Sequence, residues 1–329
     1  MWILTSPRSE FLFLYLPGLL GLLFAILIPD LGESSLLYAL IATALVDSGH
    51  VYTTAWRTLL SPAEFRSSKS YLILPLFFFF AFSAWYGLGA YGLWKFIVYA
   101  TIFHHVRQLY GINKWYQSLN GRVDRNSDYF LYFLSVIPFL AYHFRPGVPA
   151  NYYSQEDLFL FPFREVYLGF CVLFITGVIF WLVYEYKLFV KGIREPNRFV
   201  GVFFPAILYG QCFLLAQTLS QVLFPLLLSH GIAYMAILAL SLERTQRDRF
   251  RSFWIALFVI VLTAAFFGGL ESFWEEGQSE FTSGLPLFLR ASLIGATLTP
   301  LFCHYAFDAR IWKKGHREGA LVFRKPPAQ

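Results

Sequence analysis

Residues 253–270 read FWIALFVIVLTAAFFGGL, eighteen positions without a charged side chain. About 20 apolar residues cross the hydrocarbon core of a bilayer, so this stretch predicts a membrane-spanning helix. Arg251 lies just before it and Glu271 directly follows it. Because lysine and arginine collect on the cytoplasmic side of a membrane, the flanking charges also predict the direction in which this helix runs.

The composition extends this interpretation to the whole chain. Hydrophobic residues make up 57% of the 329 positions and charged residues 14%, whereas soluble proteins carry about 25% charged residues. The net charge of +6 is spread between apolar segments instead of forming one patch, which argues against a nucleic-acid partner. We therefore expect a single integral membrane domain over residues 1–329, in the inner (cytoplasmic) membrane of a bacterium.

Apolar segments of sufficient length predict about ten spans and no soluble domain. The break between the third and fourth spans depends on Gly87, Gly89 and Gly92, and the seventh and eighth spans turn near residues 217–221. The predicted spans are residues 11–28, 36–58, 71–88, 90–112, 128–144, 165–186, 199–217, 221–242, 253–270 and 286–309.

The loop charges alternate in sign with the predicted spans. Basic residues lie at or after the end of every even-numbered span, for example Arg57 at the end of the second and Lys191 after the sixth. Acidic residues such as Glu156 and Glu271 occupy the opposite loops. The positive-inside rule then assigns the end of every even-numbered span to the cytoplasm. The predicted fold is an all-α, polytopic bundle of transmembrane helices with both termini in the cytoplasm.

Five of the seven histidines lie inside predicted spans, together with two aspartates. An ionisable residue in a membrane helix costs about 2.5–3.5 kcal/mol on insertion scales and is usually present for function. The five histidines fall on the second, fourth, eighth and tenth spans, which run in the same direction. These features predict a metal site in the cytoplasmic half of the bundle. Its expected ligands are Asp47, His50, His104, His105, His230, His304 and Asp308.

The spacing of these residues supports a shared site. Asp47 and His50 are three residues apart, and His304 and Asp308 are four apart, so each pair shares one face of a helix. The carboxylate of each pair could bind the metal or fix the imidazole beside it. Imidazoles with carboxylates and without thiolates favour iron, as one or two ions, over zinc, manganese or copper.

Each histidine also has a structural interpretation. His230 could donate a hydrogen bond between packed helices. His105 could face away from the metal or contact only its ligands, because adjacent residues on a helix point about 100° apart. His143, at the outer end of the fifth span, and His316, in the basic tail, are expected to be structural or to face solvent.

The two aspartates have alternative partners as well. Asp47 could cap a helix or pair with Arg57 or Arg107, and Asp308 could form a solvated ion pair with Arg310. Either arrangement would remove a carboxylate from the metal site.

Three polar residues follow the double histidine within two turns and are the predicted catalytic residues: Arg107, Gln108 and Tyr110. Side chains of these types could orient a substrate oxygen or relay a proton. They could equally form hydrogen bonds between helices, as polar groups in membrane proteins often do.

The scatter of histidines over several transmembrane helices resembles the multi-histidine membrane oxygenases. This class includes the fatty-acid desaturases and hydroxylases and the bacterial carotene-cleaving dioxygenases. The resemblance covers the four even-numbered helices that carry histidine. The chain has His104-His105 but lacks the HxxxH and HxxHH boxes of the desaturases, and Asp47-Ser-Gly-His50 only loosely echoes the carotene-cleaving family. The resemblance therefore implies a reaction class and no individual site residue.

Together these observations predict an iron-dependent membrane oxidoreductase of the oxygenase, hydroxylase or desaturase class. Its expected partners are a lipid-like or isoprenoid-like substrate from the bilayer and a cytoplasmic electron donor that docks on the basic face. Three alternatives remain open at this point. They are a zinc hydrolase or transferase, a haem-binding electron-transfer protein and a transporter of protons or metal ions.

Overall fold

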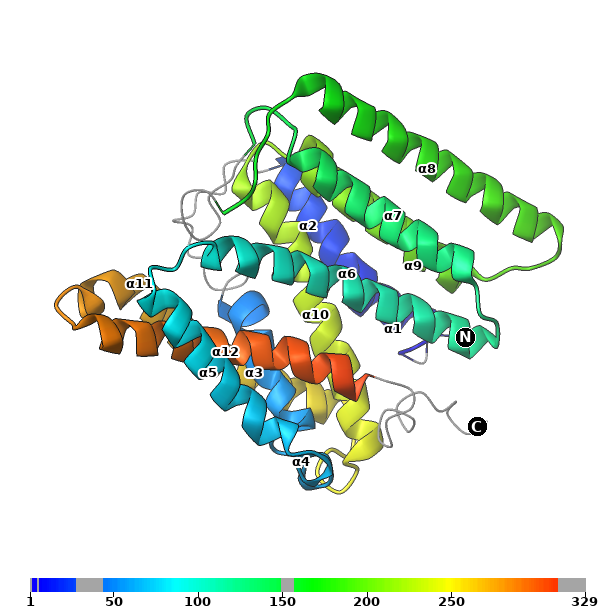
Figure 1. Cartoon of the computed structure of the whole chain (residues 1–329). Coiled ribbons are helices and arrows are strands. Elements are labelled where there is room, and N and C mark those ends of the chain that lie inside the picture. The colour runs from blue at the N-terminus through cyan, green and yellow to red at the C-terminus, as the bar shows by residue number, and fades with distance from the viewer. Residues whose placement is uncertain (1, 5, 28–43, 149–156, 313–329) are drawn as a thin grey trace. The chain divides into compact units, whose positions relative to one another are not determined.

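Helices make up most of the chain in the residues that the structure describes. The computed structural model describes residues 2–4, 6–27, 44–148 and 157–312, apart from the side chains of residues 275–281. Every regular element in these ranges is a helix (Figure 1). The predicted all-α class is confirmed for these residues. Within a bilayer, apolar segments of this length satisfy their backbone hydrogen bonds only as helices or closed barrels.

The described helices form two compact units that have one helix in common. The prediction of one domain over residues 1–329 stays a prediction. The first unit contains α1 (Pro7–Glu10), η1 (Phe11–Tyr15), α2 (Leu16–Leu27), α6 (Leu93–Asn120), α7 (Arg125–Tyr142), α8 (Arg164–Val190), α9 (Pro196–Tyr209) and η4 (Gly210–Leu215). The second contains α3 (Gly49–Thr53), η3 (Thr54–Arg57), α4 (Pro62–Ser67), α5 (Ser70–Gly87), α11 (Phe253–Thr282) and α12 (Leu287–Ile311).

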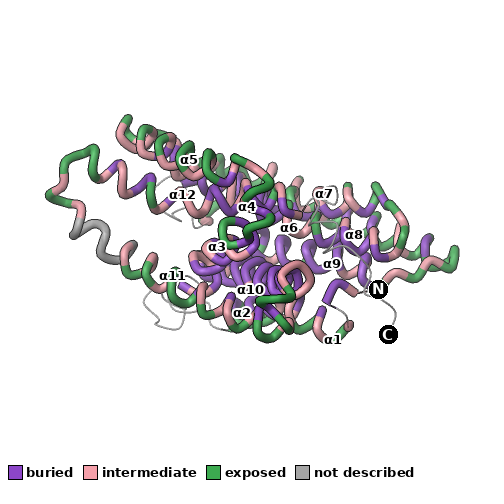
Figure 2. The backbone as a smooth tube through the Cα atoms, turned by 90° about the horizontal axis from the view of Figure 1, so that it is seen from below, coloured by how far each residue is buried: buried purple, intermediate pink, exposed green. Residues whose placement is uncertain are grey.

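Helix α10 (Leu219–Thr245) belongs to both units, since the boundary between them falls between His230 and Gly231. It is also the most deeply buried long helix, with 89% of its most apolar window buried, against 11% for α8. Figure 2 shows the buried residues of α10 in purple. A helix that is apolar on all sides belongs in a protein interior or a bilayer.

Seven helices in the described part of the chain are long and apolar enough to cross a membrane, as expected of an integral membrane protein. They are residues 7–27, 70–87, 164–190, 196–215, 219–245, 253–274 and 287–311. The predicted spans 90–112 and 128–144 correspond to α6 and α7, which are helical but more polar. The first part of the predicted span 36–58 lies outside the described residues. The count of ten spans and the orientation of the termini therefore stay predictions.

Two breaks that the sequence predicted are confirmed. Helix α5 ends at Gly87, and positive φ angles at Gly89 (105°) and Gly92 (70°) carry the chain to the start of α6. Glycine adopts such angles without a steric penalty. The predicted turn near residues 217–221 lies between the end of η4 at Leu215 and the start of α10 at Leu219.

In the first unit, α7 packs against both α8 and α9, and α2 packs against α9. Small residues permit these close contacts, as is typical of membrane helices. A Cβ atom added at Gly18 of α2 would lie 2.6 Å from the ring of Phe204 in α9, and one at Gly177 of α8 would lie 2.4 Å from the ring of Phe133 in α7.

A buried ionic network fastens the ends of α7, α8 and α9. The guanidinium of Arg198, only 1% exposed, donates to Glu185 at 2.5 and 2.8 Å and to Glu195 at 2.8 Å. It also lies 3.3 Å from Asp124, which caps α7 by accepting from the backbone N–H of Ser127. Desolvation alone would raise the pKa of Asp124, but hydrogen bonds and the charge of Arg198 hold this pKa below its ordinary value. Arg198 is thus a structural cation as well as one of the basic residues near the sixth span.

In the second unit, α5 and α12 lie side by side over most of their lengths (Figure 1). Helix α3 packs on α11, where a Cβ added at Gly49 would lie 2.5 Å from the carbonyl oxygen of Ala264. Gly231 of α10 comes equally close to residue 46, since its added Cβ would lie 2.4 Å from the Val46 oxygen. These contacts bring the backbone just before His50 against α10 and α11.

Candidate metal-binding histidine clusters

The first unit contains a cluster of three buried histidines. His104 and His105 come from α6 and His230 from α10. The rings of His105 and His230 stack with centroids 4.1 Å apart, and the His104 ring meets the His230 ring edge-on at 5.0 Å. We refer to His104, His105, His230 and the adjacent Gln108 as the α6 cluster.

Gln108 fixes the orientation of His230. Its amide Nε2 donates to the backbone carbonyl of His230 at 3.2 Å, and its Oε1 lies 2.6 Å from the His230 Nδ1. A carbonyl only accepts, so the amide nitrogen must point towards it and the amide oxygen must face the ring. Nδ1 of His230 therefore carries the proton, and the lone pair lies on Nε2.

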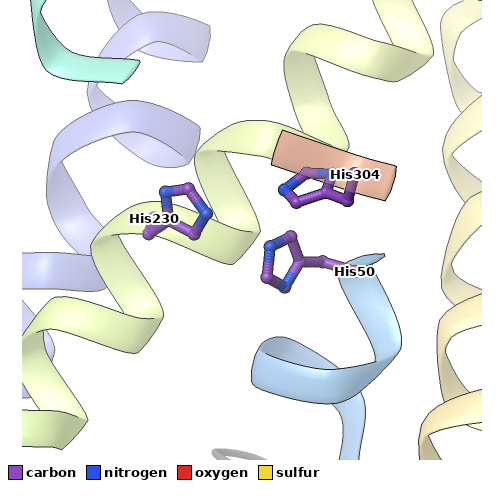
Figure 3. A group of neighbouring side chains, drawn as sticks. All are labelled: His50, His230 and His304. Carbon is purple, nitrogen blue, oxygen red and sulfur yellow. The ribbon is translucent and has the colours of Figure 1, made fainter. Parts of the chain in front are cut away.

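The second unit contains a cluster built around His50 of α3 and His304 of α12. Their rings meet edge-on with centroids 4.9 Å apart, and both side chains are buried. Figure 3 draws these two residues together with His230 of α10, each on a different helix. His50 Nδ1 lies 2.6 Å from the carbonyl oxygen of Val46, so this nitrogen also donates and Nε2 holds the lone pair.

A chain of hydrogen bonds orders the rest of the second cluster. The Tyr234 hydroxyl donates to Asp308 Oδ1 at 3.0 Å. Its oxygen lies 2.7 Å from Thr54 Oγ1, which in turn lies 2.6 Å from Nδ1 of His304. We refer to His50, His304, Asp308, Tyr234 and Thr54 as the α12 cluster.

Three histidines thus share one pattern. Nδ1 of His50, His230 and His304 each meets an oxygen, from Val46, Gln108 and Thr54 respectively. Metal-bound histidines usually donate the N–H of the second ring nitrogen to such an oxygen, which fixes the tautomer and the plane of the ring. The arrangement leaves Nε2 of all three in the form that binds a metal.

Four of the predicted ligands are buried and could hold a metal ion: His50, His230, His304 and Asp308. His304 and Asp308 share one face of α12, as their spacing predicted, with 3.8 Å between Nε2 and Oδ2. His104 and His105 are also buried. Asp47 is half-buried in the helical turn before α3.

The predicted catalytic residues separate into two places in the first unit. Gln108 contacts His230, as described above. Arg107 is exposed, donates to the hydroxyl of Tyr132 at 2.5 Å, and stacks over the ring of Tyr110 at 4.7 Å. Tyr110 and Tyr132 also pack together, with centroids 5.1 Å apart. Arg107 therefore contacts the two packed tyrosines Tyr110 and Tyr132. Of the three predicted catalytic residues, Gln108 is the one that contacts a histidine.

The arginines proposed as alternative partners of the two aspartates have carboxylate or hydroxyl contacts elsewhere. Arg57 is fully buried, donates to Ser241 at 2.8 Å and lies 3.8 Å from Glu64. Arg310 lies 3.9 Å from the same carboxylate. The guanidinium groups of Arg57 and Arg310 therefore both lie close to Glu64 of α4.

Two residues of the α12 cluster were not predicted as site residues. Tyr234 lies one turn after His230 on α10, and Thr54 lies one turn after His50. Their i, i+4 spacing from histidines is a signal that could have indicated them. Tyrosine and threonine are common in membrane helices, however, and the spacing alone does not separate them from packing residues.

His143 is structural, as expected. Its Nδ1 donates to the Phe139 carbonyl at 2.7 Å and its Nε2 accepts from the Tyr99 hydroxyl at 2.7 Å. Both ring nitrogens are occupied by protein groups, so His143 cannot bind a metal without losing one of them. His316 lies outside the described residues.

No family model, curated protein or solved structure matches this chain.

Proposed function

We propose that this protein is a metal-dependent membrane enzyme that uses non-haem iron to oxidise a hydrophobic substrate. The observation that carries the proposal is the common orientation of His50, His230 and His304. Each buried imidazole donates through Nδ1 to an oxygen of the protein, and its lone pair lies on Nε2, on the other side of the ring. Burying three such groups in apolar helices has a free-energy cost, and the free energy of ion binding offsets this cost.

The composition of the two clusters supports iron. The α12 cluster offers His50, His304 and Asp308 as ligands, and the α6 cluster offers His104 and His230. Two histidines with one carboxylate is the ligand composition of the non-haem iron(II) oxygenases. Cys303 is the neighbour of His304 in sequence, but it packs with Tyr71 and Phe307 in an apolar cluster. Thiolate ligation, which would favour other metals or iron–sulfur clusters, has no support at this position.

Iron would supply oxygen binding and one-electron chemistry. The chain's own residues do the rest. Val46, Gln108 and Thr54 fix the tautomer and the ring plane of three imidazoles. The apolar surroundings would exclude bulk water from the site, which limits side reactions.

The membrane environment supports a lipid-like or isoprenoid-like substrate. The described helices expose many large apolar side chains, among them Ile179 and Phe180 of α8 and Phe77 and Phe80 of α5. A bilayer would cover these surfaces and would also dissolve such a substrate. We propose that the substrate reaches the iron sideways from the bilayer and that electrons come from a cytoplasmic donor.

Haem binding between the paired histidines is disfavoured by the ring distances. Two axial imidazoles must leave room for the macrocycle and for two metal–nitrogen bonds of about 2 Å each. The rings of His105 and His230 stack at 4.1 Å, and those of His50 and His304 meet at 4.9 Å. Neither pair leaves that space.

Elemental analysis of the full chain, purified in detergent and loaded with Fe²⁺ without oxygen, tests the proposal. We expect one or two iron ions per chain and no Soret band, with iron content reduced in His50→Ala and His304→Ala. His143→Ala is the matched control, since it removes a buried histidine outside both clusters. Equal iron content in His50→Ala and His143→Ala, or oxidation of lipids by iron-free protein, would overturn the proposal.

A further inference from the structure

The hydroxyl of Tyr234 joins the two predicted ligands of α12 that lie one turn apart. Tyr234 comes from α10, is 2% exposed, and donates to Asp308. Through Thr54 the same hydroxyl is connected to His304. Thr54 is the first residue of η3, Tyr234 lies on α10, and His304 and Asp308 both lie on α12, so three elements contribute to this chain of hydrogen bonds.

The direction of donation along the chain follows from the number of protons available. The single hydroxyl proton of Tyr234 goes to the carboxylate of Asp308. The Tyr234 oxygen must then accept the hydroxyl proton of Thr54, and the Thr54 oxygen must accept from Nδ1 of His304. A complete chain therefore requires His304 to be protonated on Nδ1, which leaves Nε2 to bind the metal.

We propose that Tyr234 is a positioning residue of the metal centre, which sets both the tautomer of His304 and the orientation of Asp308. This inference rests on the proposed function, since it assigns a role at the same site. Tyr234 does not bind the ion itself. Its hydroxyl acts through Thr54 on one ligand and directly on the other, as outer groups do at metal sites in general.

The ring of Tyr234 has a separate, structural role. It packs edge-on against His304 with centroids 4.8 Å apart and against His50 at 5.6 Å. Phenylalanine would keep these ring contacts and lose only the hydroxyl. The substitution Tyr234→Phe therefore separates the positioning role from packing.

Titration of the metal-free full chain with Co²⁺, followed by its visible spectrum, measures the effect. We expect Tyr234→Phe to bind Co²⁺ about 10–100-fold more weakly, as for other outer-group substitutions, and to change the ligand-field bands. Tyr209→Phe is the matched control. Tyr209 is also fully buried, and its hydroxyl has no hydrogen-bond partner among the described residues. We expect its affinity and spectrum to equal those of the parent protein.

A second pair of variants keeps the test decisive if Tyr234→Phe does not fold. Thr54→Ser retains the hydroxyl in the chain and should bind Co²⁺ with nearly the parent affinity, whereas Thr54→Val should reproduce the weakened binding. If the parent protein binds no Co²⁺ or Fe²⁺, the proposed function fails. If the parent binds and Tyr234→Phe, or Thr54→Val in its place, matches Tyr209→Phe in affinity and spectrum, the positioning role of Tyr234 is overturned.

Discussion

Both polar atoms of the Gln108 amide form hydrogen bonds with His230. The nitrogen donates to the backbone carbonyl, and the oxygen accepts from Nδ1 of the ring. A glutamine that is satisfied twice by a single residue is well suited to hold that residue in place. The prediction of a catalytic role for Gln108 is untested. The geometry supports a role in orienting His230, and the neighbouring Arg107 makes contacts of a different kind.

Replacing Gln108 with leucine should weaken metal binding by about 10–100-fold, because His230 would lose the acceptor that selects its tautomer. Gln108→Glu keeps the acceptor for Nδ1 of His230 but loses the donor to its backbone carbonyl, so its affinity should lie between those of the parent protein and Gln108→Leu. Isothermal titration with Fe²⁺ under anaerobic conditions measures these affinities.

Arg107→Ala is the control for this series, since Arg107 is adjacent on α6 but contacts Tyr110 and Tyr132. It should leave the affinity unchanged. A loss of binding in Arg107→Ala as large as that in Gln108→Leu would show that the effect comes from disturbing α6 rather than from freeing His230.

At this scale the sequence identifies the ligand types better than their neighbours. Histidine and aspartate stand out in apolar segments because their burial is costly, so His50 and His304 could be selected without a structure. The choice between Gln108, Arg107 and Tyr110 needs the direction of each side chain. Tyr234 and Thr54 each lie four residues after a histidine, but their contacts with Asp308 and His304 become visible only when residues from η3, α10 and α12 are brought together.

At the scale of elements, the close approach of α11 to the segment before α3 is the most restrictive contact. A Cβ atom added at Gly268 would lie 1.6 Å from the carbonyl oxygen of Ala44 and 2.8 Å from the Cα of Gly49. The neighbouring Gly269 faces open space, with no atom within 4 Å of an added Cβ. Gly268 therefore has no room for a side chain, whereas the adjacent Gly269 has room for one.

Gly268→Ala should lower stability by about 1–3 kcal/mol, the usual cost of overfilling a packed interior, and should weaken metal binding by displacing His50. Gly269→Ala should be neutral or stabilising by up to about 1 kcal/mol, since alanine favours a helix more than glycine does. Thermal unfolding of the two variants in detergent compares them directly. Equal melting temperatures would contradict the close contact of α11 with the residue 44–49 segment.

Helices could be predicted from hydropathy wherever the chain is uniformly apolar, as at α8, α11 and α12. The helix α6 was found in the same way, although Lys95, Arg107 and Lys114 make it more polar than the spans around it. What hydropathy could not show is the environment of charges near helix ends. The positive-inside rule counts Arg57 and Arg198 among the loop charges, although both are buried against carboxylates. Such pairing depends on contacts between elements that are distant in sequence.

For the whole molecule, the positive-inside rule makes a directional prediction that the structure does not test. Lys191 follows α8 and Ser283 follows α11, and both side chains are exposed. With even-numbered spans ending in the cytoplasm, Lys191 should be cytoplasmic and Ser283 external.

Single cysteines in a background without Cys171, Cys212 and Cys303 test this topology. A membrane-impermeant maleimide added to intact spheroplasts should label Ser283→Cys and leave Lys191→Cys unlabelled until the membrane is permeabilised. The predicted order places three spans between the two positions, so they lie on opposite sides of the membrane. Labelling of both positions from outside would show that this order is wrong.

The division into two compact units is a property that the sequence did not suggest. Hydropathy scores each segment alone, whereas the units are defined by which helices contact one another. The boundary within α10 is marked by no proline, since Pro225 lies five residues earlier and inside the first unit. Gly231 stands at the boundary, but its close contact with Val46 is a feature of packing rather than a break in the helix.

An unbroken helix that belongs to two units also makes their stabilities interdependent. Helix formation is cooperative, so the half of α10 that ends at His230 cannot unwind without removing hydrogen bonds from the turn that carries Tyr234. A ligand that binds only the folded protein raises its free energy of unfolding by mass action. An ion held through His230 would therefore protect backbone amides in both units against hydrogen exchange. Binding of one ion would therefore raise the temperature at which the entire chain unfolds.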